Sequence, residues 1–97
     1  MAYNLTILPQ AQEEIRKIFE YYEQLPNSVL VRFDNQLEEV YQNLEKNPFY
    51  QVRYKHLRAI PFKSFPYLVF FDVNETEKNV HIYSVFHTAQ NPSKYPL

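Results

Sequence analysis

Tyr67-Leu68-Val69-Phe70-Phe71 is the stretch that decides the fold of this chain. All five residues are apolar or aromatic, and no polar residue interrupts them. A continuous run of this length is typical of a strand buried on both faces, whereas a half-buried strand alternates. We therefore place residues 67–71 at the centre of a β-sheet.

Two further strands are predicted on either side of this run. Residues 54–60 alternate, which puts His56 and Arg58 on the face opposite their apolar neighbours. Residues 80–87 alternate in the same way, and the polar loop 74–79 before them suits a hairpin connection. Strands that are linked by short turns pair antiparallel. The second half of the chain therefore predicts an antiparallel sheet.

The first half predicts one strand and two helices. Residues 3–7 alternate as a short half-buried strand does. Apolar residues then recur at helical spacing from Pro9 to Leu25, and again from Asn27 to Asn47. Because only two or three residues join these helices, they should lie antiparallel as a hairpin.

The predicted element order is strand, helix, helix, strand, strand, strand. Ninety-seven residues form a single domain, here residues 1–97. An α+β fold in which a helical hairpin packs on one face of a mostly antiparallel four-stranded sheet would bury the apolar stripe of each helix. The other face of the sheet would then stay available, and Arg58 could meet a partner there.

Cysteine and glycine are both absent. The first absence excludes disulfides, thiolate zinc sites and a cysteine nucleophile, and the second excludes glycine-rich phosphate loops. Positions with positive φ should fall to Asn or Asp, whose short side chains tolerate that conformation. Neither a signal peptide nor an apolar run of the ~20 residues that cross a bilayer is present. We expect a cytoplasmic protein without a cofactor.

The net charge of −1 conceals a strong segregation of charge along the chain. Residues 1–45 carry a net charge of −5, whereas residues 46–71 carry five basic side chains and no acid. The five basic residues are Lys46, Arg53, Lys55, Arg58 and Lys63. They either face an anionic partner or complement the acidic helices of the same fold, and the sequence favours neither alternative.

Three stretches carry a resemblance to a known family. Residues 57–71 read LRAIPFKSFPYLVFF, an Arg-bearing strand, a Phe-Pro-Tyr turn and a buried aromatic strand. Residues 85–95 read VFHTAQNPSKY, a His, a polar turn with Asn-Pro, and an aromatic residue. The helical pattern between Ala11 and Pro48 precedes them. In this order, over nearly the whole chain, they resemble the RelE/ParE superfamily of toxins from type II toxin–antitoxin systems.

The resemblance implies a small intracellular toxin that is neutralised when a cognate antitoxin wraps a C-terminal segment over its surface. RelE-like members cut messenger RNA on the ribosome, and ParE-like members poison DNA gyrase. The Phe65-Pro66-Tyr67 turn and the ending from His87 to Pro92 look closer to the ParE-like, plasmid-stabilisation branch.

Two positions depart from the pattern of active members. RNA-cleaving members tend to have Arg where this chain has Leu68, and ParE-like endings often have Arg where it has Gln90. The sequence pI near 6.3 is also low for a protein that must neutralise RNA phosphates. These departures weigh against a ribosome-dependent endoribonuclease. They leave open a non-toxic binding module on the same scaffold, such as a homodimer formed through the helical hairpin.

The candidate site residues follow from these alternatives. If the chain cleaves RNA, His87 and Tyr95 could exchange protons while Arg58 and Lys63 hold phosphate; His87 could instead bond the backbone of the turn that follows it. Residues that could bind a partner are Arg53, Lys55, Arg58 and Lys63. The alternation places His81 and His87 on one face of a strand, six residues apart. At the rise of a β-strand this is too far for them to bind the same ion, so we expect no metal site.

Overall fold

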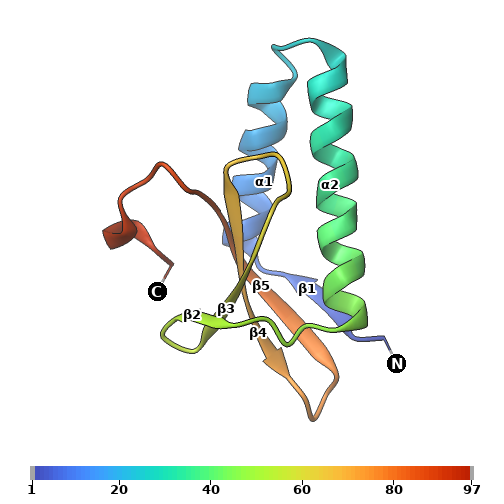
Figure 1. The fold of residues 1–97 in the computed structure, drawn as a ribbon, viewed down its shortest axis with the longest axis vertical. Coiled ribbons are helices and arrows are strands. Elements are labelled where there is room, and N and C mark those ends of the chain that lie inside the picture. Colours follow the sequence, from blue (N-terminus) through green and yellow to red (C-terminus); the bar gives the residue numbers. More distant parts are fainter. Residues whose placement is uncertain (1, 97) are drawn as a thin grey trace.

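In the computed structural model, which describes residues 2–96, two helices lie side by side over one face of a sheet (Figure 1). The helices are α1 (Pro9–Tyr22) and α2 (Asn27–Lys46). The strands are β1 (Asn4–Ile7), β2 (Val52–Tyr54), β3 (Leu57–Pro61), β4 (Tyr67–Asn74) and β5 (Asn79–His87). A short 3₁₀ helix, η1 (Pro92–Lys94), follows. Neither α-helix of the described chain has the length and apolar character that crossing a bilayer requires.

The α+β class and the helical hairpin are confirmed, but the sheet has five strands and not four. Its order is β1-β5-β4-β3-β2, in which β1 runs parallel to β5 and the other pairs are antiparallel. The predicted strand 54–60 is two strands, because the chain turns back at Lys55, where φ is 51°. The second residue with positive φ is Lys78, in the β4–β5 loop, at 54°. The expectation that Asn or Asp would occupy such positions is wrong for both turns.

An extra residue in β5 interrupts the predicted alternation of the last strand. Phe70 pairs with Ser84, whereas Phe71 pairs with Ile82. A bulge of this kind moves the following side chains to the other face. Val85 therefore joins the core beneath the helices, and Phe86 joins the opposite face.

The carboxylate of Glu14 in α1 holds this bulge. Its Oε1 accepts hydrogen bonds from the Ser84 hydroxyl at 2.8 Å and from the Val85 N–H at 3.0 Å. The Ser84 side chain is almost fully buried, at 1% exposure. A buried hydroxyl needs such a partner, because leaving it unpaired costs free energy. Glu14 therefore fixes both the bulge and the position of α1 over β5.

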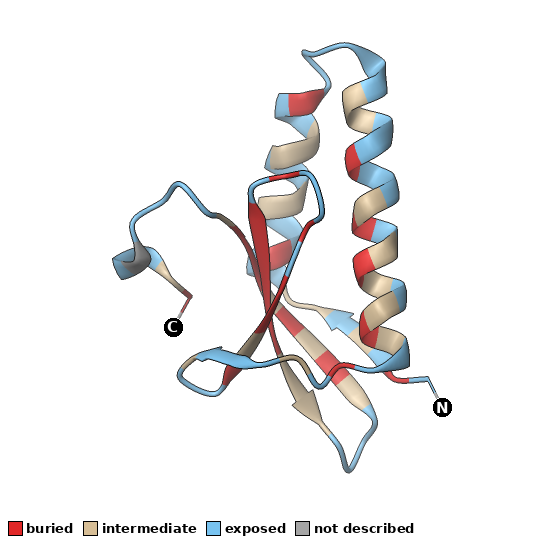
Figure 2. Cartoon of the chain, viewed as in Figure 1, coloured by how far each residue is buried: buried red, intermediate tan, exposed pale blue. Residues whose placement is uncertain are grey.

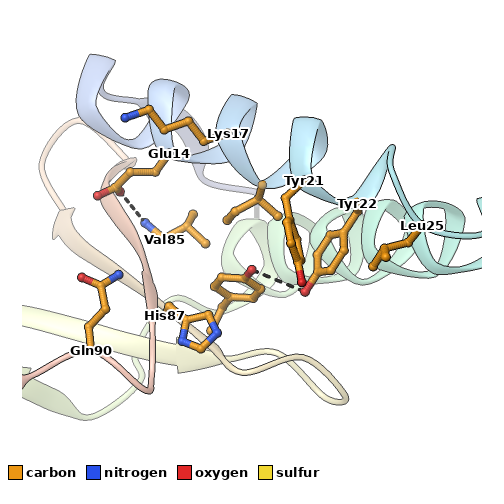
Figure 3. A pocket seen from close by; sticks show the side chains of 10 residues that line it. Glu14, Lys17, Tyr21, Tyr22, Leu25, Val85, His87 and Gln90 are labelled. Carbon is orange, nitrogen blue, oxygen red and sulfur yellow. Dashed lines mark hydrogen bonds between the residues drawn. The ribbon is translucent and has the colours of Figure 1, made fainter.

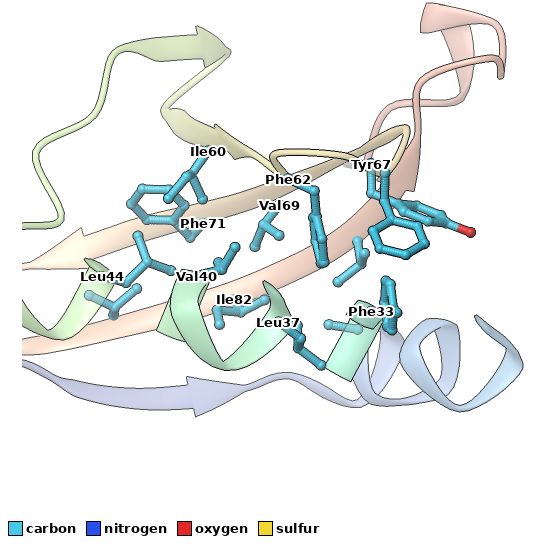
Figure 4. Packing of buried hydrophobic residues seen from close by; sticks show 14 of the residues in the cluster. Phe33, Leu37, Val40, Leu44, Ile60, Phe62, Tyr67, Val69, Phe71 and Ile82 are labelled. Atoms are coloured by element: carbon cyan, nitrogen blue, oxygen red, sulfur yellow. The ribbon is translucent and has the colours of Figure 1, made fainter. Parts of the chain in front are cut away.

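The main core lies between the helices and the sheet (Figure 4). Phe33 of α2 is fully buried and contacts the rings of Phe19, Tyr22, Phe62, Phe65 and Tyr67. The Phe65–Tyr67 segment is therefore turn and core, as its sequence suggested. Figure 2 shows that the helix surfaces turned toward the sheet are buried while their outer surfaces are exposed.

The opposite face of the sheet is partly covered, so the expectation that it stays available is wrong in part. A second buried cluster there contains Leu57, Ala59, Leu68, Phe70 and Phe86. The C-terminal segment turns back over this cluster. Tyr95 places its ring 5.0 Å from Phe70, 4.9 Å from Phe86 and 5.2 Å from Tyr54.

Candidate partner-binding surfaces

A pocket of about 530 Å³ lies between α1 and the adjoining ends of β4 and β5 (Figure 3). Its lining is Glu14, Lys17, Ile18, Tyr21, Tyr22, Leu25, Tyr67, Val85, His87 and Gln90. Tyr21 and Leu25 remain 59% and 38% exposed, which is high for side chains of this size. Apolar side chains with polar groups among them suit an amphipathic segment of another protein.

His87 lies in this pocket, and its ring is held in place. Its Nδ1 accepts a hydrogen bond from the Ala89 N–H at 3.0 Å, which confirms the predicted bond to the following turn. Its ring stands edge-on to Tyr67, with 5.2 Å between ring centroids. In the neutral ring, a proton on Nε2 is the tautomer that this bond requires.

Tyr67 forms the inner wall of the pocket. Its hydroxyl lies 3.4 Å from that of Tyr22, and its side chain is only 7% exposed. Burial, and then the hydrogen bond with Tyr22, hold the pKa of Tyr67 well above its ordinary value of 10. Burial likewise raises the pKa of Tyr41 to about 12.

This shift predicts how the fold responds to alkali. The folded pKa of Tyr67 is raised, so its contribution to stability is complete below the unfolded pKa of about 10 and is lost as pH rises through the folded pKa. Tyrosinate absorbance should therefore show a late step in which Tyr67 ionises only as the fold opens, beyond the delayed ionisation of Tyr41. Tyr67→Phe should remove that late step and no other. A spectrum in which all nine tyrosines ionise together near pH 10 in the folded protein would contradict this.

The four catalytic candidates lie in separate surroundings. His87 lines the pocket under α1, whereas Tyr95 packs on the opposite face of the sheet. Arg58 pairs across the sheet with Phe71 of the main core, so it lies on the helix side and not on the face that we predicted. Lys63 forms an ion pair with Glu39 of α2 at 2.7 Å. The geometry gives no support to a shared catalytic centre of these four residues.

Arg58 is committed within the fold. One guanidinium nitrogen, Nη1, donates to the Tyr50 carbonyl at 2.6 Å, and the group lies 5.5 Å from the centre of the Phe49 ring. The sequence left both a helix acid and an outside partner open for Arg58, but its hydrogen bond goes to the loop after α2. The reason is the strand register, which places Arg58 beside that loop.

The other three basic residues of the segment 46–71 lie around β2, the strand at one edge of the sheet. Lys46 lies at the end of α2, Arg53 lies in β2, and Lys55 lies in the turn after β2. We call these three residues the basic edge. All three residues are exposed. Among residues 2–96, Arg53 and Lys46 form no ion pair, and the Lys55 ammonium lies 5.4 Å from the centre of the Tyr54 ring. Of the two alternatives for the basic segment, pairing with an acid of the same fold is shown for Lys63.

A polar network on the far face of the sheet was not predicted. Oδ2 of Asp72 accepts a hydrogen bond from the Tyr83 hydroxyl at 3.0 Å, and Oδ1 of Asp72 lies 3.0 Å from His81 Nδ1. His56 Nε2 lies 3.8 Å from the same carboxylate. The bulge separates His81, in this network, from His87, in the pocket, so they do not share a face. Within the described chain, no group of three or more His, Asp or Glu side chains could hold a metal ion.

Sequence reasoning also missed the α1 side of the pocket. The helical pattern of residues 9–25 predicts Tyr21 as a core or helix-contact residue, but it is exposed. Leu25 was counted in the buried stripe, although α1 ends at Tyr22. The available signal was their spacing of four residues, because the helical pattern predicts residues at that spacing on one face.

The comparisons with known proteins give this fold a family. Residues 5–92 match the family described as the ParE toxin of the type II toxin-antitoxin system, parDE. The match covers most of the chain, and the protein belongs to this family. A search among curated proteins finds no match to the sequence.

Solved structures support the same fold. A chain from the chromosomal ParDE system of P. aeruginosa is 15% identical with a TM-score of 0.71, over 89% of this chain and 96% of that one. A chain of the RelBE2 toxin–antitoxin complex from Mycobacterium tuberculosis is also 15% identical, with a TM-score of 0.62, over 90% and 99%. A chain of the intact E. coli RelBE complex is 20% identical, with a TM-score of 0.54, over 93% and 100%.

Proposed function

We propose that this chain is a growth-inhibiting toxin of the ParE-like kind, acts in the cytoplasm, and is neutralised by a cognate antitoxin. The match of residues 5–92 to the ParE toxin family carries the proposal. The solved chains that share its fold come from toxin–antitoxin systems and complexes, which supports an antitoxin as the partner. The pocket under α1 and the basic edge offer two exposed surfaces that such a partner could cover.

For the target, we propose DNA gyrase in preference to the ribosome. Cleavage of RNA requires a base, an acid and cations around one phosphate. His87, Tyr95, Arg58 and Lys63 lie in separate surroundings, and Arg58 and Lys63 are already engaged within the fold. The position just after the turn is Leu68, which is buried in the cluster under Tyr95. These observations favour a toxin that binds its target over one that cleaves RNA.

Expression of the chain alone should arrest bacterial growth, and co-expression with a short reading frame encoded beside it should relieve the arrest. Gyrase-dependent DNA breaks in arrested cells would support the proposed target. RNA cleavage in a translating extract, without such breaks, would replace it with the ribosome. An Arg58→Ala variant that remains folded should stay toxic, because the Arg58 guanidinium bonds the Tyr50 carbonyl of the same chain and is not offered to a target.

The competing function is a non-toxic binding module. Gln90, at the rim of the pocket, favours it, since ParE-like endings often have Arg there. Absence of growth arrest at every expression level, with the protein shown to be folded and soluble, would favour this alternative.

A further inference from the structure

β2 is the edge of the sheet, and its first two residues are open to solvent, whereas Tyr54 is half-buried. The strand order ends at β2, so β3 is its neighbour on one side. Gln51, Val52 and Arg53 are all exposed, and Val52 is 46% exposed although it is apolar. An edge strand presents a row of backbone N–H and C=O groups with which another chain can pair.

The register of β2 shows which of its backbone groups point outward. The Ala59 N–H of β3 donates to the Gln51 carbonyl at 3.3 Å, so the backbone polar groups of Gln51 face β3. Val52 lies opposite Arg58 in the same ladder. Because these groups alternate in direction along a strand, the N–H and C=O of Val52 point away from the sheet. They are placed to pair with a strand added outside β2.

The charge around β2 selects the kind of strand that would fit. Arg53 and Lys55 flank Tyr54 on the outer strand and its turn, and Lys46 lies at the end of the helix that leads into it. Residues 46–71 contain no acid. An extended acidic segment would therefore meet opposite charge along this edge, which favours and orients its approach.

The opposite edge of the sheet offers no comparable surface. There, Leu5 and Ile7 of β1 pack against the main core. The Tyr3 N–H just before β1 donates to the Glu45 carbonyl of α2 at 2.8 Å. Residues 1–45, which include β1 and nearly all of both helices, carry a net charge of −5. β1 itself carries no basic side chain that could select an acidic strand.

We propose that β2 is a docking edge, onto which an extended acidic segment of a partner protein adds as a further strand. The inference rests on the proposed function in one respect, since the partner would be the antitoxin. Backbone pairing with Val52 would hold the segment, and Arg53 with Lys55 would select its acidic side chains. Nucleic acid fits less well, because a phosphate can accept from the outward N–H of Val52 but offers no donor to its C=O, and three cations are few for neutralising a run of phosphates.

The test uses a short peptide in which Glu and Val alternate, titrated into the isotope-labelled full chain and followed by amide resonances. The resonances of Val52 and its neighbours should shift, and the Val52 amide should become protected from hydrogen exchange. The same peptide with every second backbone nitrogen methylated should bind at least about tenfold more weakly, because it cannot form the ladder on that side. Added salt should weaken both peptides.

Two variants separate the backbone of Val52 from its side chain. Val52→Pro removes the outward N–H, which an edge strand tolerates, and should weaken peptide binding about three- to tenfold. Val52→Ala keeps the N–H and should change binding far less. Thermal unfolding checks that both variants are folded. Equal binding of the methylated and unmethylated peptides, equal binding by the Pro and Ala variants, or no binding at all would overturn the proposal.

Two further readings distinguish the possible failures. An oligouridine probe that displaces the peptide and binds Val52→Pro as tightly as the unchanged chain would assign the edge to nucleic acid and overturn the proposal. Growth arrest is measured separately with the unchanged chain. Growth arrest without peptide pairing supports the toxin proposal and overturns the docking edge. Peptide pairing without growth arrest supports the docking edge and counts against the toxin proposal.

Discussion

Phe33→Ala should lower the free energy of unfolding by about 3–5 kcal/mol, the usual cost of removing a fully buried phenyl ring. Phe33 has no exposed surface, and its ring stacks on Phe62 and contacts Phe65 in the turn before β4 and Tyr67 at the start of β4. The variant loses ring contacts that join α2 to both α1 and the sheet. Since domains of this size are stable by only about 5–15 kcal/mol, this loss is a large share of the total stability.

Urea denaturation monitored by circular dichroism measures this effect. Val31→Ala is the matched control, because it lies two residues away in the same helix with its side chain 48% exposed. It makes the same replacement by Ala at the surface and should change stability by no more than about 0.5 kcal/mol. Similar midpoints for the two variants would show that the Phe33 ring does not hold the core together.

Glu14→Ala should lower the free energy of unfolding by about 2–3 kcal/mol, because hydrogen bonds to a charged acceptor are among the stronger ones and their loss here leaves buried donors unpaired. Both the Ser84 hydroxyl and the Val85 N–H would lose their acceptor. The bulge in β5 would then have no partner in α1. Amide exchange at Val85 should accelerate, which reports the local effect directly.

Two companion variants identify the cause. Glu14→Gln keeps an oxygen acceptor without the charge, and should recover a large part of the lost stability. Glu13→Ala, one residue earlier in the same helix, removes an exposed ion pair with Arg16 and should have little effect. If Glu13→Ala and Glu14→Ala lower stability equally, the contact with Ser84 contributes nothing specific.

The sequence predicts the helices and the central strand because their signals are local. Pro9, Pro26 and the Asn47-Pro48 pair mark helix boundaries, and the apolar periodicity between them is strong. The uninterrupted run beginning at Tyr67 forms β4. Each of these features depends on residues that are neighbours in the chain, so no knowledge of the tertiary structure is required.

The features that sequence reasoning missed depend on residues far apart in the chain. The bulge at Ser84 is held by Glu14, seventy residues earlier. β2 has three residues and exists as a strand because β3 lies beside it. Lys55 takes a positive φ because the β2–β3 pairing on both sides of it requires a tight turn. No periodicity within a short window encodes such constraints.

The candidate site shows the same limit. The basic residues were found from composition alone, but composition could not show that Lys63 would pair with Glu39 or that Arg58 would bond the Tyr50 carbonyl. The pocket combines α1 with the ends of β4 and β5, so its lining became visible only with the fold. His87 is the candidate that sequence reasoning placed correctly beside its turn.

The pairing of β1 with β5 also has a consequence for the synthesis of the protein. The first strand, at Asn4–Ile7, aligns with Asn79–Ile82, near the other end of the chain, and β5 separates it from β4. A nascent polypeptide that has not yet emerged past β5 lacks the strand that joins its two halves. The sheet should therefore be completed only after β5 has emerged from the ribosome, so β1 waits, exposed and unpaired, while most of the domain is synthesised.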